Sequence, residues 1–177
     1  MARIVLVYGH VAGLIIISGV IATVAFSGDQ PHGNVWLGYL IMLLGMSAVF
    51  MGVKRFRDRD RGGVIKFLPA LGVGLAIALF ASLAYVLVWE GYLAVTDYQF
   101  MDQYVAATLE ARRAEGVSGE AYRRLEASLQ EMVVAYRSPF YRLPITFSEI
   151  FPVGLLVSIV SAILLRNARF LPARAHA

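Results

Sequence analysis

The stretch FLPALGVGLAIALFASLAYVLVW, from Phe67 to Trp89, contains no charged residue. The hydrocarbon core of a bilayer is about 30 Å thick, and roughly 20 apolar residues in an α-helix cross it. Three other stretches have comparable length and composition: Ile4 to Phe26, Val35 to Val53 and Ile145 to Leu165. The sequence therefore predicts four transmembrane helices.

The amino-acid composition is that of a membrane protein. The chain has 177 residues, of which 59% are hydrophobic and 16% are charged, and its mean hydropathy is +0.67. Soluble globular domains usually contain about 45–50% apolar and about 25% charged residues. The net charge of +4 comes from short basic clusters beside the apolar stretches, which indicates membrane topology and not a nucleic-acid partner.

Few kinds of chemical site are compatible with this sequence. The absence of cysteine excludes disulfides, thiolate metal sites and a cysteine nucleophile. No histidines or acidic residues have the spacing of metal ligands, and no catalytic triad or phosphate loop is present, so we expect no metal, cofactor or enzymatic activity. His32 and His176 are isolated, and His10 is expected to bond a backbone carbonyl or a serine more readily than to relay protons.

Lysine and arginine residues near the span ends predict the orientation, because cytoplasmic loops are enriched in them. Ten lie on one side of the predicted spans: Arg3, Lys54, Arg55, Arg57, Arg59, Arg61, Lys66, Arg166, Arg169 and Arg174. The short loop 27–34 on the other side has none, and the six in the long segment between the third and fourth spans are offset by acidic residues. Both termini are therefore expected in the cytoplasm.

The segment 96–136 is polar and predicts two helices. Thr96 and Gln99 fit a capping box at the start of the first, and Gly116 and Gly119 interrupt the helical pattern. Mostly apolar residues recur at helical spacing on either side of this break: Phe100, Met101, Tyr104, Val105 and Thr108, then Tyr122, Leu125, Leu129, Met132, Val133 and Tyr136. The two apolar faces are expected to pack on each other, on the membrane surface or on the spanning helices, or to dock a partner.

The predicted fold is thus an all-α membrane protein with four transmembrane helices and an extracytoplasmic helical hairpin between the third and the fourth. We expect a single domain over residues 1–177, with 96–136 as the insert.

Small residues predict where the spanning helices touch, because lipid-embedded helices associate through close backbone approach. Gly38, Gly45 and Gly52 are spaced by seven in the second span, and Gly154 and Ser158 are spaced by four in the fourth. These faces would serve packing within one four-helix bundle, or else a homo-oligomer or another membrane protein.

Glu149 lies where the fourth span is predicted to begin. Thr146 and Glu149 fit a capping box, in which the carboxylate also faces the positive end of the helix dipole. Alternatively, Glu149 and Glu90 form a polar site in the outer leaflet that shares a proton, holds a cation or binds Arg137 or Arg142.

The loop KRFRDRDRGG, from Lys54 to Gly63, is the most polar run of the chain. Its basic residues are candidates for binding anionic lipid headgroups: Lys54, Arg55, Arg57, Arg59 and Arg61. Topology alone would also require most of them.

Two long motifs resemble one protein family. They are VFMGVKRFRDRDRGGVIKF and SPFYRLPITFSEIFPVGLLVSIVSAILL, and the opening LVYGHVAGLI agrees with them. The chain resembles the bacterial membrane family known as domain of unknown function 4199. That resemblance implies four spans and an extracytoplasmic insert, hence a bacterial inner membrane, and it supplies no activity, cofactor or catalytic residue.

The interpretation that follows is a non-enzymatic accessory or scaffold protein of the inner membrane. Its expected partners are membrane lipids and either a second copy of the chain or another membrane protein. The alternative is a lipid-binding or small-solute or ion transport module.

Overall fold

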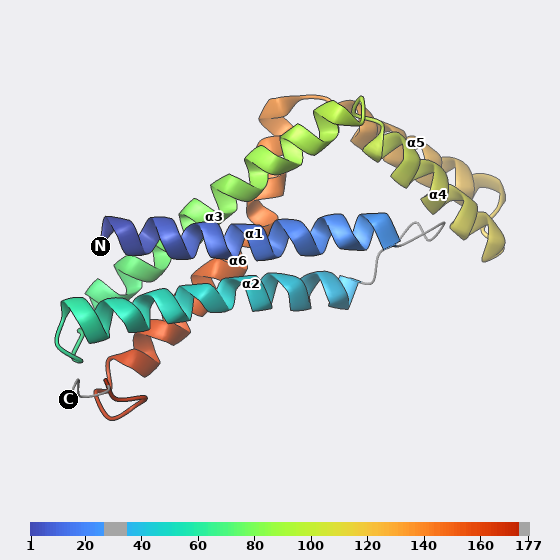
Figure 1. The fold of residues 1–177 in the computed structure, drawn as a ribbon. Coiled ribbons are helices and arrows are strands. Elements are labelled where there is room, and N and C mark those ends of the chain that lie inside the picture. Colours follow the sequence, from blue (N-terminus) through green and yellow to red (C-terminus); the bar gives the residue numbers. More distant parts are fainter. Residues whose placement is uncertain (27–34, 174–177) are drawn as a thin grey trace.

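The computed structural model describes residues 1–26 and 35–173, and every regular element in those ranges is helical (Figure 1). Four helices are long and apolar enough to cross a membrane: α1 (Ala2–Phe26), α2 (Val35–Arg55), α3 (Phe67–Val95) and α6 (Pro139–Leu165). The prediction of an all-α protein with four membrane-spanning helices is therefore confirmed.

Three further elements complete the described chain. A short π-helix, η1 (Phe56–Asp60), continues α2, and the helices α4 (Phe100–Ala114) and α5 (Gly119–Tyr136) lie between α3 and α6. We call α4 and α5 together the insert. The loop 27–34 with His32, and the last four residues with Arg174 and His176, lie outside the described residues.

The four spanning helices, which we call the helix core, pack around apolar side chains. Fully buried residues from each helix meet there: Ile16, Val49, Ile77 and Ile150. Three buried serines donate to the carbonyl four residues earlier in their own helix: Ser82, Ser158 and Ser161. These three hydroxyl groups are thus satisfied within a single helix.

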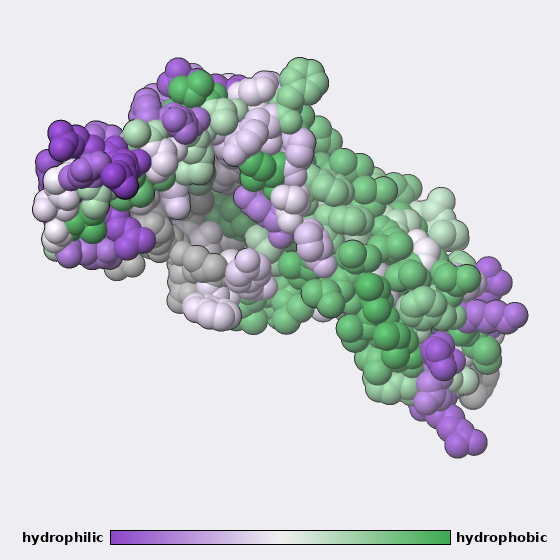
Figure 2. Space-filling view, turned by 180° about the vertical axis from the view of Figure 1, so that it is seen from behind, coloured by the Kyte–Doolittle hydropathy of each residue, from purple (hydrophilic) through white to green (hydrophobic). Residues whose placement is uncertain are grey.

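The outward faces of the helix core are also apolar. Each spanning helix exposes large hydrophobic side chains, including Leu14, Leu43, Leu87 and Leu156. Figure 2 shows this surface as a continuous green region between the polar insert and a second polar region at the far end. A surface of this kind is suited to contact with lipid chains.

Both described ends of the chain lie at the same end of the helix core (Figure 1). The amino terminus is 3.6 Å from Asp60 in η1, and Phe170 of the segment 166–173 contacts Arg57 of the same element. We call this the basic end. The insert projects from the opposite end, which we call the insert end.

Small residues allow close helix contacts at four of the five predicted positions. A Cβ atom would overlap Ile16 at Gly45, and it would lie 2.5 Å from Ile77 at Gly52 and 2.7 Å from Ala78 at Gly154. Ser158 lies against Gly74 of α3. These contacts are made within one chain.

The expected contact at Gly38 is not made with any described residue. A Cβ atom there would meet no atom of the described residues within 4 Å. Gly38 lies in the first turn of α2, next to the part of the chain outside the described residues.

Two predicted capping boxes are wrong. Helix α6 begins at Pro139, with Ser138 as its N-cap, so Thr146 and Glu149 lie inside the helix and cap nothing. Proline is well suited to the first position of a helix, and it starts α6 six residues before the predicted start. Thr96 ends α3, where its hydroxyl donates to the carbonyls of Tyr92 and Leu93, and α4 begins after Gln99.

Candidate functional site

At the insert end, Arg142 is a buried arginine in the first turn of α6. Its side chain is 3% exposed, and Nε and Nη2 donate to the two carboxylate oxygens of Glu90 over 2.6 and 2.7 Å. This bidentate geometry is that of the strongest arginine–carboxylate pairs. The pair joins α6 to the last turns of α3.

The remaining nitrogen of Arg142 binds the end of α5. Nη1 donates to the carbonyl of Tyr136 over 2.8 Å and lies 3.3 Å from the carbonyl of Arg137. Carbonyls in the last turn of a helix have no partner within it and carry the negative end of the helix dipole. One side chain therefore connects α3, α5 and α6.

Two tyrosine rings cover the guanidinium group. The Arg142 Cζ atom lies 5.0 Å from the ring centroid of Tyr98 and 5.7 Å from that of Tyr136. Tyr98 and its neighbour Asp97 have φ angles of +56° and +52°, a conformation that is costly for residues other than glycine. The stacking of Tyr98 on Arg142 offsets part of this strain at the turn between α3 and α4.

The Tyr136 hydroxyl is a second connection at the same place. It accepts a hydrogen bond from Trp89 Nε1 over 2.9 Å and forms a side-chain hydrogen bond with Thr146. Burial raises the pKa of Tyr136, so the hydroxyl stays protonated at neutral pH. We call the set Glu90, Arg142, Tyr98, Tyr136 and Trp89 the insert joint.

The structure separates the residues that the sequence grouped as one polar site. Glu90 binds Arg142, whereas Arg137 lies 3.9 Å from Asp102 in an exposed contact. The expected pair of Glu90 and Glu149 is not formed, because Glu149 follows Arg142 by seven residues and lies about 10 Å further along α6. Glu149 is exposed on the helix surface.

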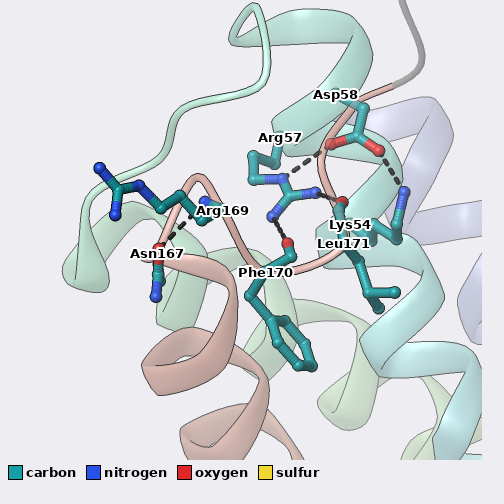
Figure 3. A network of polar contacts seen from close by, with 7 residues as sticks. All are labelled: Lys54, Arg57, Asp58, Asn167, Arg169, Phe170 and Leu171. Carbon is teal, nitrogen blue, oxygen red and sulfur yellow. Dashed lines mark hydrogen bonds and ion pairs between the residues drawn. The ribbon is translucent and has the colours of Figure 1, made fainter.

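A second buried arginine lies at the basic end. Arg57, in η1, is fully buried, and its Nη1 and Nη2 donate to the carbonyls of Phe170 and Leu171 over 2.9 and 2.5 Å (Figure 3). Its Nε donates to Asp58, which also binds Lys54. This cluster holds the segment 166–173 against the end of α2, and Leu171 there has a φ angle of +47°.

The predicted headgroup site is wrong for Arg57. Its three guanidinium nitrogens are all used within the protein, and none is exposed. Lys54 is engaged with Asp58. Three of the five predicted basic residues have exposed side chains: Arg55, Arg59 and Arg61.

The described histidine and acidic side chains do not gather into a metal site. No cluster of three or more histidine, aspartate or glutamate side chains is arranged to hold a metal ion in residues 1–26 and 35–173. His10 is exposed, its Nδ1 lies 2.7 Å from the Leu6 carbonyl, and its ring contacts Phe80.

An apolar groove runs between α1 and α3 near the insert end. It is shallow, and its lining includes Ile17, Ile21, Tyr85 and Trp89. The groove is open to the surface that faces lipid.

Sequence reasoning named Glu90 and Arg142 but missed their surroundings. Ser138 and Pro139 together are a helix-start signal. A prediction that used this signal would have included Arg142 in α6 and could have placed it on the side of the helix that faces α3. Arg57 is bound by the main-chain carbonyls of Phe170 and Leu171. Every residue type has such a carbonyl, so nothing in the sequence indicates these partners.

Comparison with known proteins gives one match, to a protein family. The sequence model of the family described as "Protein of unknown function (DUF4199)" matches residues 7–167. No curated protein and no solved structure matches the chain.

Proposed function

The chain belongs to the DUF4199 family of proteins of unknown function, and from this premise we propose that it is a non-enzymatic accessory or scaffold subunit of a bacterial inner membrane. Its role would be to hold the insert in a fixed orientation outside the cytoplasm, where a partner binds it.

The insert joint is the observation that carries this proposal. A free two-helix segment would need only a flexible connection to its anchor. Here Arg142, Tyr136 and Trp89 tie α5 to α3 and α6, and Trp89 also packs edge-on against Phe100 of α4. These contacts fix the direction of the insert relative to the helix core, as a protein that presents the insert to a partner requires.

The outward face of α5 is the proposed docking surface. The inner faces of α4 and α5 are used by each other, since Met101, Val105, Leu129 and Val133 form a common buried cluster. A shallow open surface remains on α5, lined by Ala127, Gln130, Glu131, Val134 and Ala135. Val134 is 64% exposed there, which makes this face mixed apolar and polar, as docking surfaces commonly are.

Site-specific photo-crosslinking tests the docking surface. A photoreactive amino acid at Val134 is expected to capture one defined protein in membranes of the source organism. The matched control at Leu87, which is 73% exposed on α3, is expected to capture lipid alone. Equal protein capture at both positions, or none at Val134, would contradict the proposed function.

The orientation is proposed from the distribution of basic residues, with the basic end in the cytoplasm. Because the chain has no cysteine, single cysteines can be labelled without a background. A membrane-impermeant maleimide applied to intact spheroplasts is expected to label Gln130→Cys on the insert and to spare Lys66→Cys at the basic end. The reverse pattern would place the insert in the cytoplasm.

A second function, lipid binding, is favoured by the groove between α1 and α3. Val88 lines the groove and is 41% exposed, so Val88→Trp should fill it without disturbing the helix core. Native mass spectra of the wild type are then expected to show a retained lipid that the variant lacks. Identical spectra would leave the groove without a ligand.

A further inference from the structure

Glu149 is a carboxylate on the membrane-spanning helix α6 that the protein itself does not neutralise. It is exposed, and it makes no hydrogen bond or ion pair with the described residues. Ionisable residues inside a membrane are costly, so an unpaired one marks a functional contact.

The carboxylate stands on an apolar face of α6 that the helix core leaves free. Pro152 and Leu156 follow Glu149 by three and seven residues, which places them on the same side of the helix. Both are exposed, and Ile163, a further seven residues on, is 52% exposed. A second helix lying along this face would bring one of its side chains to Glu149.

The charge of Glu149 determines which occupant fits this face. A lone carboxylate in apolar surroundings is complementary to a cationic group. Within the described spans, a second copy of this chain has its lysine and arginine side chains at the basic end, except for Arg142, and its His10 ring is packed against Phe80. Arg142 is buried and has its donors occupied, so a second copy in parallel orientation has no free cation at the depth of Glu149.

A lipid amine fits this position less well than a side chain. The ring belt of Trp89 and Tyr92 at the end of α3 indicates the interface, where headgroups lie. Glu149 is about 10 Å deeper along α6 than Arg142, which is level with Glu90 beside that belt. An ethanolamine group would have to leave the interface to reach it.

We propose that Glu149 binds a lysine, arginine or histidine of a partner's transmembrane helix, which lies along the exposed face through Leu156. This inference rests on the proposed accessory function, and it gives the chemistry of the partner inside the membrane.

A synthetic peptide tests the proposal without a known partner. The full-length protein carries a donor fluorophore at Gln130→Cys in phosphatidylcholine vesicles. The acceptor is on a leucine–alanine transmembrane peptide with one lysine at the depth of Glu149. Matched peptides carry leucine in place of lysine, or the lysine in the opposite leaflet.

The lysine peptide is expected to associate about tenfold more tightly than either control peptide, as polar contacts between lipid-embedded helices allow. Glu149→Gln is expected to remove this difference, and it should fold because Glu149 supports no contact. Glu126→Gln, at an exposed carboxylate on the insert outside the docking surface, is the matched control and should leave the difference unchanged.

Each contrary result overturns the inference in a recognisable way. Equal binding of the leucine peptide, or full binding to Glu149→Gln, shows that the carboxylate is not the contact. Loss of the difference when phosphatidylethanolamine is added assigns the site to a lipid amine. Energy transfer between two protein copies that Glu149→Gln abolishes assigns it to a carboxyl pair in a dimer.

The failure of this inference is distinct from the failure of the proposed function. If Val134 captures a protein while the lysine peptide fails, the accessory function stands and the inference falls. If Val134 captures no protein, the accessory function falls whatever the peptide does.

Discussion

Arg142 and Arg57 are both buried, one at each end of the helix core, yet their partners differ. Arg142 is neutralised by Glu90 from another spanning helix, so its ion pair fixes how α3 and α6 meet. Arg57 forms an ion pair with Asp58, its neighbour in sequence, and its other two nitrogens donate hydrogen bonds to two main-chain carbonyls. The first arrangement sets the geometry of the core and the insert, whereas the second fastens a terminal segment.

Removing Arg142 should give the largest effect. Arg142→Met leaves the Glu90 carboxylate unpaired and releases the end of α5, and loss of one partner of a buried pair costs about 3–5 kcal/mol. We expect that loss in the free energy of unfolding in detergent, together with faster hydrogen exchange throughout α4 and α5. Arg137→Met, which removes only an exposed contact, is the control and should change stability by less than about 0.5 kcal/mol. Equal effects of the two variants would show that the insert joint does not orient the insert.

Removing Arg57 should give an intermediate and more local effect. Arg57→Met leaves two carbonyls without donors, which should lower the free energy of unfolding by about 1–3 kcal/mol. The loss stays local because water can bind these carbonyls once the segment 166–173 detaches. We expect residues 166–173 to become sensitive to limited proteolysis while exchange in the insert stays slow. Arg59→Met, on the exposed side of η1, should leave proteolysis unchanged. A global loss of stability as large as that of Arg142→Met would contradict the claim that Arg57 holds only the terminal segment.

Removing the Tyr136 hydroxyl should give the smallest effect. Tyr136→Phe loses its bonds to Trp89 and Thr146, and a net hydrogen bond contributes about 1 kcal/mol. Because burial raises the pKa of Tyr136 above its ordinary value of 10.0, its contribution is complete below that pH and is lost as the pH rises through the folded pKa. We therefore expect the difference in the free energy of unfolding between the wild type and Tyr136→Phe to shrink as the pH is raised from neutral to alkaline. Unfolding curves recorded at both pH values measure this difference. A difference that grows with pH would contradict this sign.

The spans could be predicted from the sequence because length and hydropathy alone determine them. Gly45 and Gly52 could be placed at contacts because their spacing nearly matches the helical repeat, whereas Gly38 meets no described residue. Pairing of Glu90 with an arginine was foreseeable from charge, whereas the choice of Arg142 depends on the start of α6. The carbonyl partners of Arg57 could not be foreseen, because every residue has a carbonyl.

The length of α3 has a mechanical consequence. This helix has 29 residues, about 43 Å, which exceeds the thickness of the hydrocarbon core and carries the insert joint to its far end. Spanning helices tilt when bilayer thickness changes. Because the joint fastens the insert to α3, the insert acts as a lever. A tilt of about 10° would swing the tip of α4, about 22 Å away, by about 4 Å. A change in membrane thickness would thereby become a displacement of the surface that a partner meets.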